Sequence, residues 1–103
     1  KPELEAIYIY FGKNEVAYAI AMAENGLDCT AVSKTNDHGL FQINAVHKGK
    51  FRGDVYDCYE NTRVAYEIYK KQGWRPWSAY ENGRYLNFLS QAKEIVKNYF
   101  SDR

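Results

Sequence analysis

Glu24 is the residue whose type and position most directly indicate chemistry. It lies near the end of a predicted helix over residues 14–25, on the apolar face that it shares with Ala17, Ile20 and Ala21. Apolar surroundings and the negative end of the helix dipole both disfavour a charged carboxylate, so we expect a raised pKa for Glu24. A carboxyl group of raised pKa is suited to general acid catalysis near neutral pH. The alternative is a frayed helix end at which Glu24 turns to solvent.

The run Asn-Asp-His-Gly-Leu-Phe-Gln-Ile-Asn at residues 36–44 supplies groups that would complete such a site. An extended backbone over residues 41–44 would place Gln42 and Asn44 on one face, where paired amides suit hydroxyl and N-acetyl recognition. Asp37 follows Glu24 by 13 residues. That is enough chain to bring the two carboxyl groups within the roughly 5–9 Å that separates paired carboxyls in glycosidases. The alternative for Asp37 is an ordinary turn residue.

The elements that must position these residues are mostly helical. Pro2 and Gly12 delimit a first helix, and Asn14 and Gly26 a second. Helical periodicity is lost from Leu27 to about Tyr56, which predicts short strands or irregular turns. A third helix begins at Asp57 or Asn61 and ends at Gly73, a short helical turn covers residues 74–80, and a final helix carries the apolar residues from Tyr85 to Tyr99. The sequence predicts an α+β domain, mainly helical, with a minimal central β or irregular lobe.

Length and charge exclude several classes of protein. The 103 residues fit a single domain over positions 1–103, expected to be a monomer. A formal net charge of +1 gives no basic stripe for nucleic acid. The densest basic run consists of Lys48, Lys50 and Arg52, which we interpret as a solvated loop, with a site for an anionic partner as the alternative. No apolar run approaches the ~18 residues of a membrane span, and no signal peptide begins the chain.

Cys29 and Cys58 flank the central lobe and are predicted to form a disulfide. Two unpaired buried thiols are the alternative. Two cysteines are too few for a structural zinc site, and His38 and His47 are not at finger spacing, so neither a metal nor another cofactor is expected. We interpret both histidines as loop or cleft-edge residues.

Four motifs resemble those of a known enzyme superfamily. Glu24-Asn25-Gly26, Ala31-Val32-Ser33 and Gly39-Leu40-Phe41-Gln42-Ile43 occur in the order of the lytic transglycosylase (SLT) signature, and Ser78–Gly83 resembles that family's Ala-Ala-Tyr-Asn-x-Gly motif. The run at 36–44 and the segment Trp77–Asn82 also resemble stretches of the animal (chicken-type) lysozymes. The resemblance spans residues 14–85, most of the chain, and implies a lysozyme-like fold.

The resemblance implies a role for individual residues of this chain. Glu24 would be the catalytic acid, Asp37 would take the second-carboxylate position of animal lysozymes, and the sugar cleft would be lined by Gln42, Asn44, Trp77 and Tyr80. Two positions depart from the transglycosylase pattern. Asn25 replaces the serine after the catalytic glutamate, and Glu81 replaces the asparagine after the motif tyrosine.

The implied activity is cleavage of the β-1,4 bond between N-acetylmuramic acid and N-acetylglucosamine in peptidoglycan. Hydrolysis is favoured because Asp37 matches the lysozyme pattern, and a lytic transglycosylase that forms 1,6-anhydro ends is the alternative. A non-catalytic glycan-binding module on the same fold is the third possibility. The expected partners are peptidoglycan glycan strands, and the expected location is extracytoplasmic or secreted.

Overall fold

The limits of the helices follow from capping residues in the computed structural model, which describes residues 1–103. Asn14 accepts a hydrogen bond from the Val16 amide at 3.1 Å, and Asp57 accepts two from the first turn of its helix at 2.9 Å each. Gly26 ends the second helix with φ 71°, a left-handed conformation that suits glycine. The helices are α1 (Pro2–Phe11), α2 (Glu15–Asn25), α3 (Cys58–Gln72), α4 (Ser78–Glu81) and α5 (Leu89–Tyr99), with shorter 3-10 segments η1 (Ala45–Lys50) and η2 (Arg84–Phe88). Asp57 is therefore the residue that caps α3.

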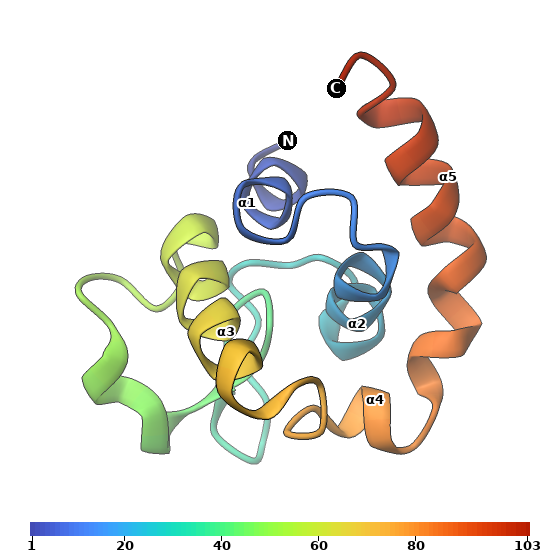
Figure 1. Ribbon diagram of the computed structural model, residues 1–103. Coiled ribbons are helices and arrows are strands. Elements are labelled where there is room, and N and C mark those ends of the chain that lie inside the picture. Colours follow the sequence, from blue (N-terminus) through green and yellow to red (C-terminus); the bar gives the residue numbers. More distant parts are fainter.

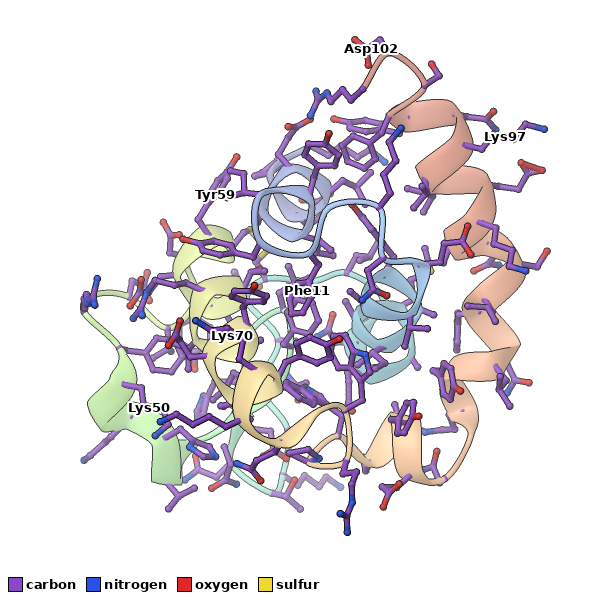
Figure 2. The ribbon with its side chains drawn as sticks, in the orientation of Figure 1. Phe11, Lys50, Tyr59, Lys70, Lys97 and Asp102 are labelled. Atoms are coloured by element: carbon purple, nitrogen blue, oxygen red, sulfur yellow. A yellow bond between two sulfur atoms is a disulfide. The ribbon has the colours of Figure 1, made fainter.

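The second helix lies at the centre of the molecule, between α1 and α3 on one side and α5 on the other (Figure 1). Its residues 17–21 are fully buried, and Tyr18 satisfies its hydroxyl group by donating to the Gly12 carbonyl at 2.7 Å. A helix that is apolar on all sides belongs in a core. Beside it, Phe11 lies among aromatic side chains between α1, α3 and the central segment (Figure 2), contacting Phe41, Tyr66, Tyr69 and Trp74.

The central lobe contains a two-stranded antiparallel sheet, β1 (Asp37–His38) and β2 (Ile43–Asn44), in which Asp37 pairs with Asn44. The predicted extended segment at 41–44 is therefore strand only at its second half. Gln42 has φ 50°, because it belongs to the turn between the strands. The burial alternation still holds, since Phe41 and Ile43 are buried and Asn44 is exposed. The predicted class, mainly helical with a minimal β lobe, is confirmed.

A fully buried asparagine fixes the turn between the strands. Asn61 donates to the carbonyls of His38 and Val55, both at 3.0 Å, and accepts from the Phe41 amide at 2.8 Å. Gly39 has φ 80°, and a Cβ there would overlap the Asn61 side chain. Only glycine is compatible with this backbone and this close approach.

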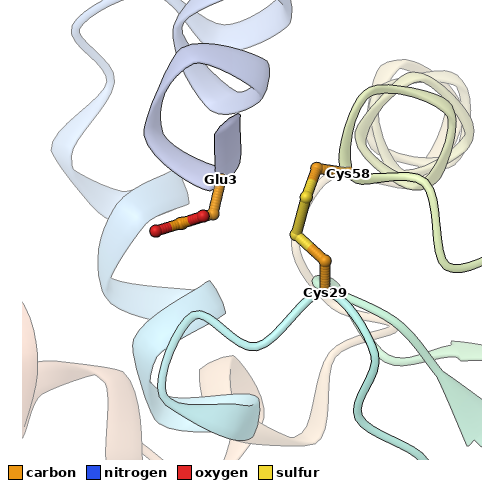
Figure 3. A group of neighbouring side chains, drawn as sticks. All are labelled: Glu3, Cys29 and Cys58. Atoms are coloured by element: carbon orange, nitrogen blue, oxygen red, sulfur yellow. A yellow bond between two sulfur atoms is a disulfide. The ribbon is translucent and has the colours of Figure 1, made fainter. Parts of the chain in front are cut away.

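The Cys29–Cys58 disulfide is present and joins the segment after α2 to the first residue of α3 (Figure 3). None of the helices has the length and apolar character needed to cross a membrane. The ends of the chain lie near each other (Figure 1), where Arg103 makes two hydrogen bonds to the Glu5 carboxylate at 2.9 and 3.1 Å.

Removal of the disulfide is expected to lower the free energy of unfolding by about 3–4 kcal/mol, because it closes a loop that otherwise adds entropy to the unfolded chain. The length of that loop follows from the separation of 29 positions between the two cysteines. Urea unfolding of the protein with and without reductant measures the effect. A Cys29→Ala/Cys58→Ala variant should have the stability of the reduced protein, and reductant should not change it. Equal stability of the unmodified protein with and without reductant would contradict the prediction.

Candidate active site

A cavity of about 180 Å³ lies where the end of α2, the β-hairpin and the segment before α4 meet. We call it the acid cleft, and it is lined by Glu24, Asp37, Gln42, Ile43, Asn44, His47, Ile68, Pro76, Trp77 and Ser78. Five of the six residues predicted from the sequence line it, and the sixth, Tyr80, does not. The cleft brings together side chains that are up to 54 positions apart, from Glu24 to Ser78.

Glu24 is nearly buried, with 11% of its side chain exposed. One carboxylate oxygen, Oε2, accepts a hydrogen bond from the Ala79 amide at 3.3 Å, and the other lies 4.0 Å from the Arg84 guanidinium. Burial raises the pKa of Glu24, and the charge of Asp37 raises it further. The Ala79 amide and Arg84 act in the opposite direction without cancelling the effect of burial on this pKa. Glu24 therefore retains a proton to higher pH than an exposed glutamate does.

The pKa of Asp37 is displaced in the opposite direction to that of Glu24. Burial raises its pKa, but hydrogen bonds from Thr35, Asn44 and Ser33 outweigh this, and the net pKa of Asp37 is lowered. The three donors lie 2.5, 2.9 and 3.1 Å from its carboxylate oxygens. The cleft therefore contains two carboxyl groups with pKa values displaced in opposite directions, one suited to donate a proton and one to remain ionised.

The two predicted amides are largely committed to the protein. Gln42 donates to the carbonyls of Ala31 and Gly39 at 3.2 and 3.0 Å, which leaves its Oε1 to accept from a ligand. Asn44 donates to the Thr35 carbonyl and to Asp37, and accepts from the Val46 amide. Asn44 thus positions the second carboxylate.

The two predicted aromatic residues differ in placement. Trp77 lines the cleft but is only 4% exposed, and its indole N–H donates to the Phe41 carbonyl at 2.8 Å. It offers an apolar wall beside Glu24. Tyr80 stacks instead on Tyr85, with ring centroids 5.0 Å apart, outside the residues that line the cleft. The sequence pattern placed Tyr80 near the acid, but α4 begins at Ser78 and Tyr80 lies on its Tyr85 side.

A comparison with protein families matches residues 10–79, more than half of the chain, to the family described as a lysozyme-like domain. The chain belongs to this family. No curated protein and no solved structure matches the chain. Domains of the lysozyme-like family are usually glycosidases or lytic transglycosylases, so membership associates the chain with cleavage of peptidoglycan glycans. The matched segment contains Glu24, Asp37 and the other residues of the acid cleft.

Sequence reasoning did not identify Arg84 as a neighbour of the acid in this lysozyme-like domain. Arg84 contributes the guanidinium closest to Glu24, and it lies 60 positions away and outside the matched segment. His47 lines the cleft, as a cleft-edge residue would. Burial, and then the charge of Lys50, lower the pKa of His47, so its ring is more often neutral than that of an exposed histidine.

Asn25 occupies the position where the resemblance predicts serine. Its amide nitrogen donates to the carbonyls of Gly39 and Leu40 at 2.9 and 2.7 Å, and its oxygen accepts from the Asp28 amide. The departure is therefore structurally useful in this lysozyme-like domain, since Asn25 ties the hairpin turn to the end of the helix that carries Glu24.

One group of side chains has the composition of a metal site. Glu3, Cys29 and Cys58 lie together (Figure 3), with potential ligand atoms within 4.8 Å of one another. The disulfide engages both sulfur atoms, so Glu3 offers the only remaining ligand.

Proposed function

We propose that this lysozyme-like domain is a muramidase that hydrolyses the β-1,4 bond between N-acetylmuramic acid and N-acetylglucosamine. The observation that carries the proposal is the pair of carboxyl groups in one cleft, with the pKa of Glu24 raised and the pKa of Asp37 lowered. Opposite displacement of this kind is typical of glycosidases that divide acid and ionised roles between two carboxyls.

In the proposed reaction Glu24 donates its proton to the glycosidic oxygen as the bond to the muramic acid C1 breaks. Asp37 stabilises the positive charge that develops at that carbon, with its own orientation fixed by Ser33, Thr35 and Asn44. A water molecule then adds to C1 and returns a proton to Glu24. The Trp77 wall and the buried surroundings favour the protonated form of the acid beforehand.

A lytic transglycosylase is the second candidate, and a specific observation favours it. The three donors around Asp37 lie within seven residues of it and also stabilise the hairpin, as they would around an ordinary turn residue. In that case Glu24 acts alone, first as acid and then as base, and the 6-hydroxyl of muramic acid captures C1 to give a 1,6-anhydro end.

Mass spectrometry of muropeptides released from purified cell walls separates the candidates. Hydrolysis predicts reducible ends, and an Asp37→Asn variant that loses activity by about 10²-fold or more, the low end of what one catalytic group contributes. Asp102→Asn, at an aspartate with 82% of its side chain exposed, is the matched control and should remain active. Predominantly anhydro ends, or a nearly fully active Asp37→Asn, would contradict hydrolysis. Binding to cell walls without release of any product would instead support a non-catalytic glycan-binding module.

Arg84→Gln is expected to move the alkaline limb of the pH profile of kcat/KM to higher pH. The general acid works while Glu24 is protonated, and Arg84 favours the ionised form by lowering this pKa, so its removal keeps the acid protonated further into the alkaline range. Turbidity-clearing rates across pH measure the shift. Arg75→Gln is the control, since Arg75 is exposed and does not line the cleft. An unmoved limb in Arg84→Gln would contradict this role.

We also propose an extracytoplasmic or secreted location. A peptidoglycan substrate lies outside the cytoplasm, and disulfides such as Cys29–Cys58 persist in oxidising compartments.

A further inference from the structure

A second cavity, also of about 180 Å³, adjoins the acid cleft and shares Ile43 and Asn44 with it. We call it the side cavity. Most of its wall is apolar and comes from Ile43, Ala45, Phe51, Val55 and the ring of Tyr56. An engineered apolar cavity of about 150 Å³ holds a benzene molecule, so the side cavity accommodates a group of several non-hydrogen atoms.

The polar groups of the side cavity are satisfied within the protein, with one exception. His38 uses one ring nitrogen with the Tyr56 hydroxyl and the other with Asn36, both at 2.8 Å, and Asn44 is committed to the hairpin. Lys48 remains, with an ammonium group that makes no hydrogen bond or ion pair. The cavity therefore has mostly apolar walls, and Lys48 is the one lysine or arginine among the residues that line it.

A ligand that fits this chemistry carries a small alkyl group close to a carboxylate. It must also reach the side cavity while a glycan occupies the acid cleft, because the two cavities share part of their walls. On a peptidoglycan strand, the substituent of muramic acid meets both conditions, since its lactyl ether is followed by a short peptide that bears methyl groups and carboxylates.

We propose that the side cavity binds the peptide arm of a muramic acid residue of the bound strand, with an alkyl group against Ile43 and Phe51 and a carboxylate facing Lys48. The inference rests on the proposed function. It makes Lys48 a specificity-determining residue that favours strands with intact peptides over bare ones. It does not involve Lys48 in bond cleavage.

The test compares glycan strands carrying their peptides with strands from which an amidase has removed the peptides and on which the freed lactyl carboxylates have been converted to neutral methylamides. The unmodified protein is expected to have a KM up to about fivefold lower on peptide-bearing strands, because a surface ion pair is worth up to ~1 kcal/mol. In Lys48→Met the ratio of the two KM values should approach one. Ala45→Leu, which fills the cavity without altering charge, should also reduce the ratio.

Lys50→Met is the matched control, because Lys50 projects from the same lobe (Figure 2) but does not line the side cavity. It should keep the full preference. Equal KM values for both substrates in the unmodified protein, or an equal loss in Lys50→Met and Lys48→Met, would overturn the proposal, the latter by indicating a diffuse basic surface. Absence of cleavage of both substrates would instead contradict the muramidase proposal.

Discussion

Glu24→Gln is expected to lower the rate of cell-wall cleavage by about 10²–10⁴-fold while the protein remains folded, because general acid catalysis contributes that range. Glutamine keeps the shape of the side chain and its acceptor for the Ala79 amide, but it has no proton to donate. Turbidity-clearing rates, with circular dichroism to verify folding, measure the effect. Glu94→Gln, at an exposed glutamate of α5, is the control and should behave as the unmodified protein.

The same variant carries a second, independent signature in its stability. The folded-state pKa of Glu24 is raised, so its contribution to stability is complete at low pH and is lost as the pH rises through that raised pKa. The neutral amide does not incur this loss. As the pH rises, the melting temperature of Glu24→Gln should therefore increase relative to that of the unmodified protein. Glu94→Gln should show no such trend. Retention of more than about a tenth of the activity in a folded Glu24→Gln would rule out the acid assignment.

Asn61→Leu is expected to lower the free energy of unfolding by about 3 kcal/mol or more. Leucine has a similar volume, so the main effect is the loss of three hydrogen bonds, which leaves the Phe41 amide and the carbonyls of His38 and Val55 without partners. Each unsatisfied buried group costs about 1–3 kcal/mol. In a domain of this size the melting temperature would fall by more than about 10 °C.

Urea and thermal unfolding measure this loss, with Asn98→Leu as the control at an exposed asparagine of α5. Because Asn61 binds backbone on both sides of Gly39, the variant should also mobilise the hairpin that carries Asp37. A loss below about 1 kcal/mol would mean that water or a rearranged turn satisfies the freed groups.

The features that the sequence predicted are those governed by local rules. Helix limits at Asn14 and Gly26 depend on hydrogen bonds and backbone angles within a few residues. The buried state of Glu24 follows from helical periodicity, which places it on the Ala17 face. The Cys29–Cys58 bridge was predicted because the chain has no other cysteine.

The features that the sequence did not predict depend on contacts between distant segments. Arg84 approaches Glu24 only because η2 follows α4 across the end of α2, and Asn61 looks like any polar residue near a helix start. The hairpin turn was mistaken for strand because an alternating pattern does not reveal that Gln42 adopts φ 50°. Tyr80 was expected in the cleft from motif spacing, which does not determine the side of α4 on which it lies.

The contact between Arg103 and Glu5 has a consequence for protein engineering. It holds the first and last segments together at the end of the molecule opposite α4 (Figure 1). A linker joining the two ends could therefore be short, and the additional loop that it closes would be small. New ends opened in the exposed loop around Gly53 would lie outside the acid cleft. The domain is accordingly suited to circular permutation, and to insertion as a cassette into a surface loop of a host protein.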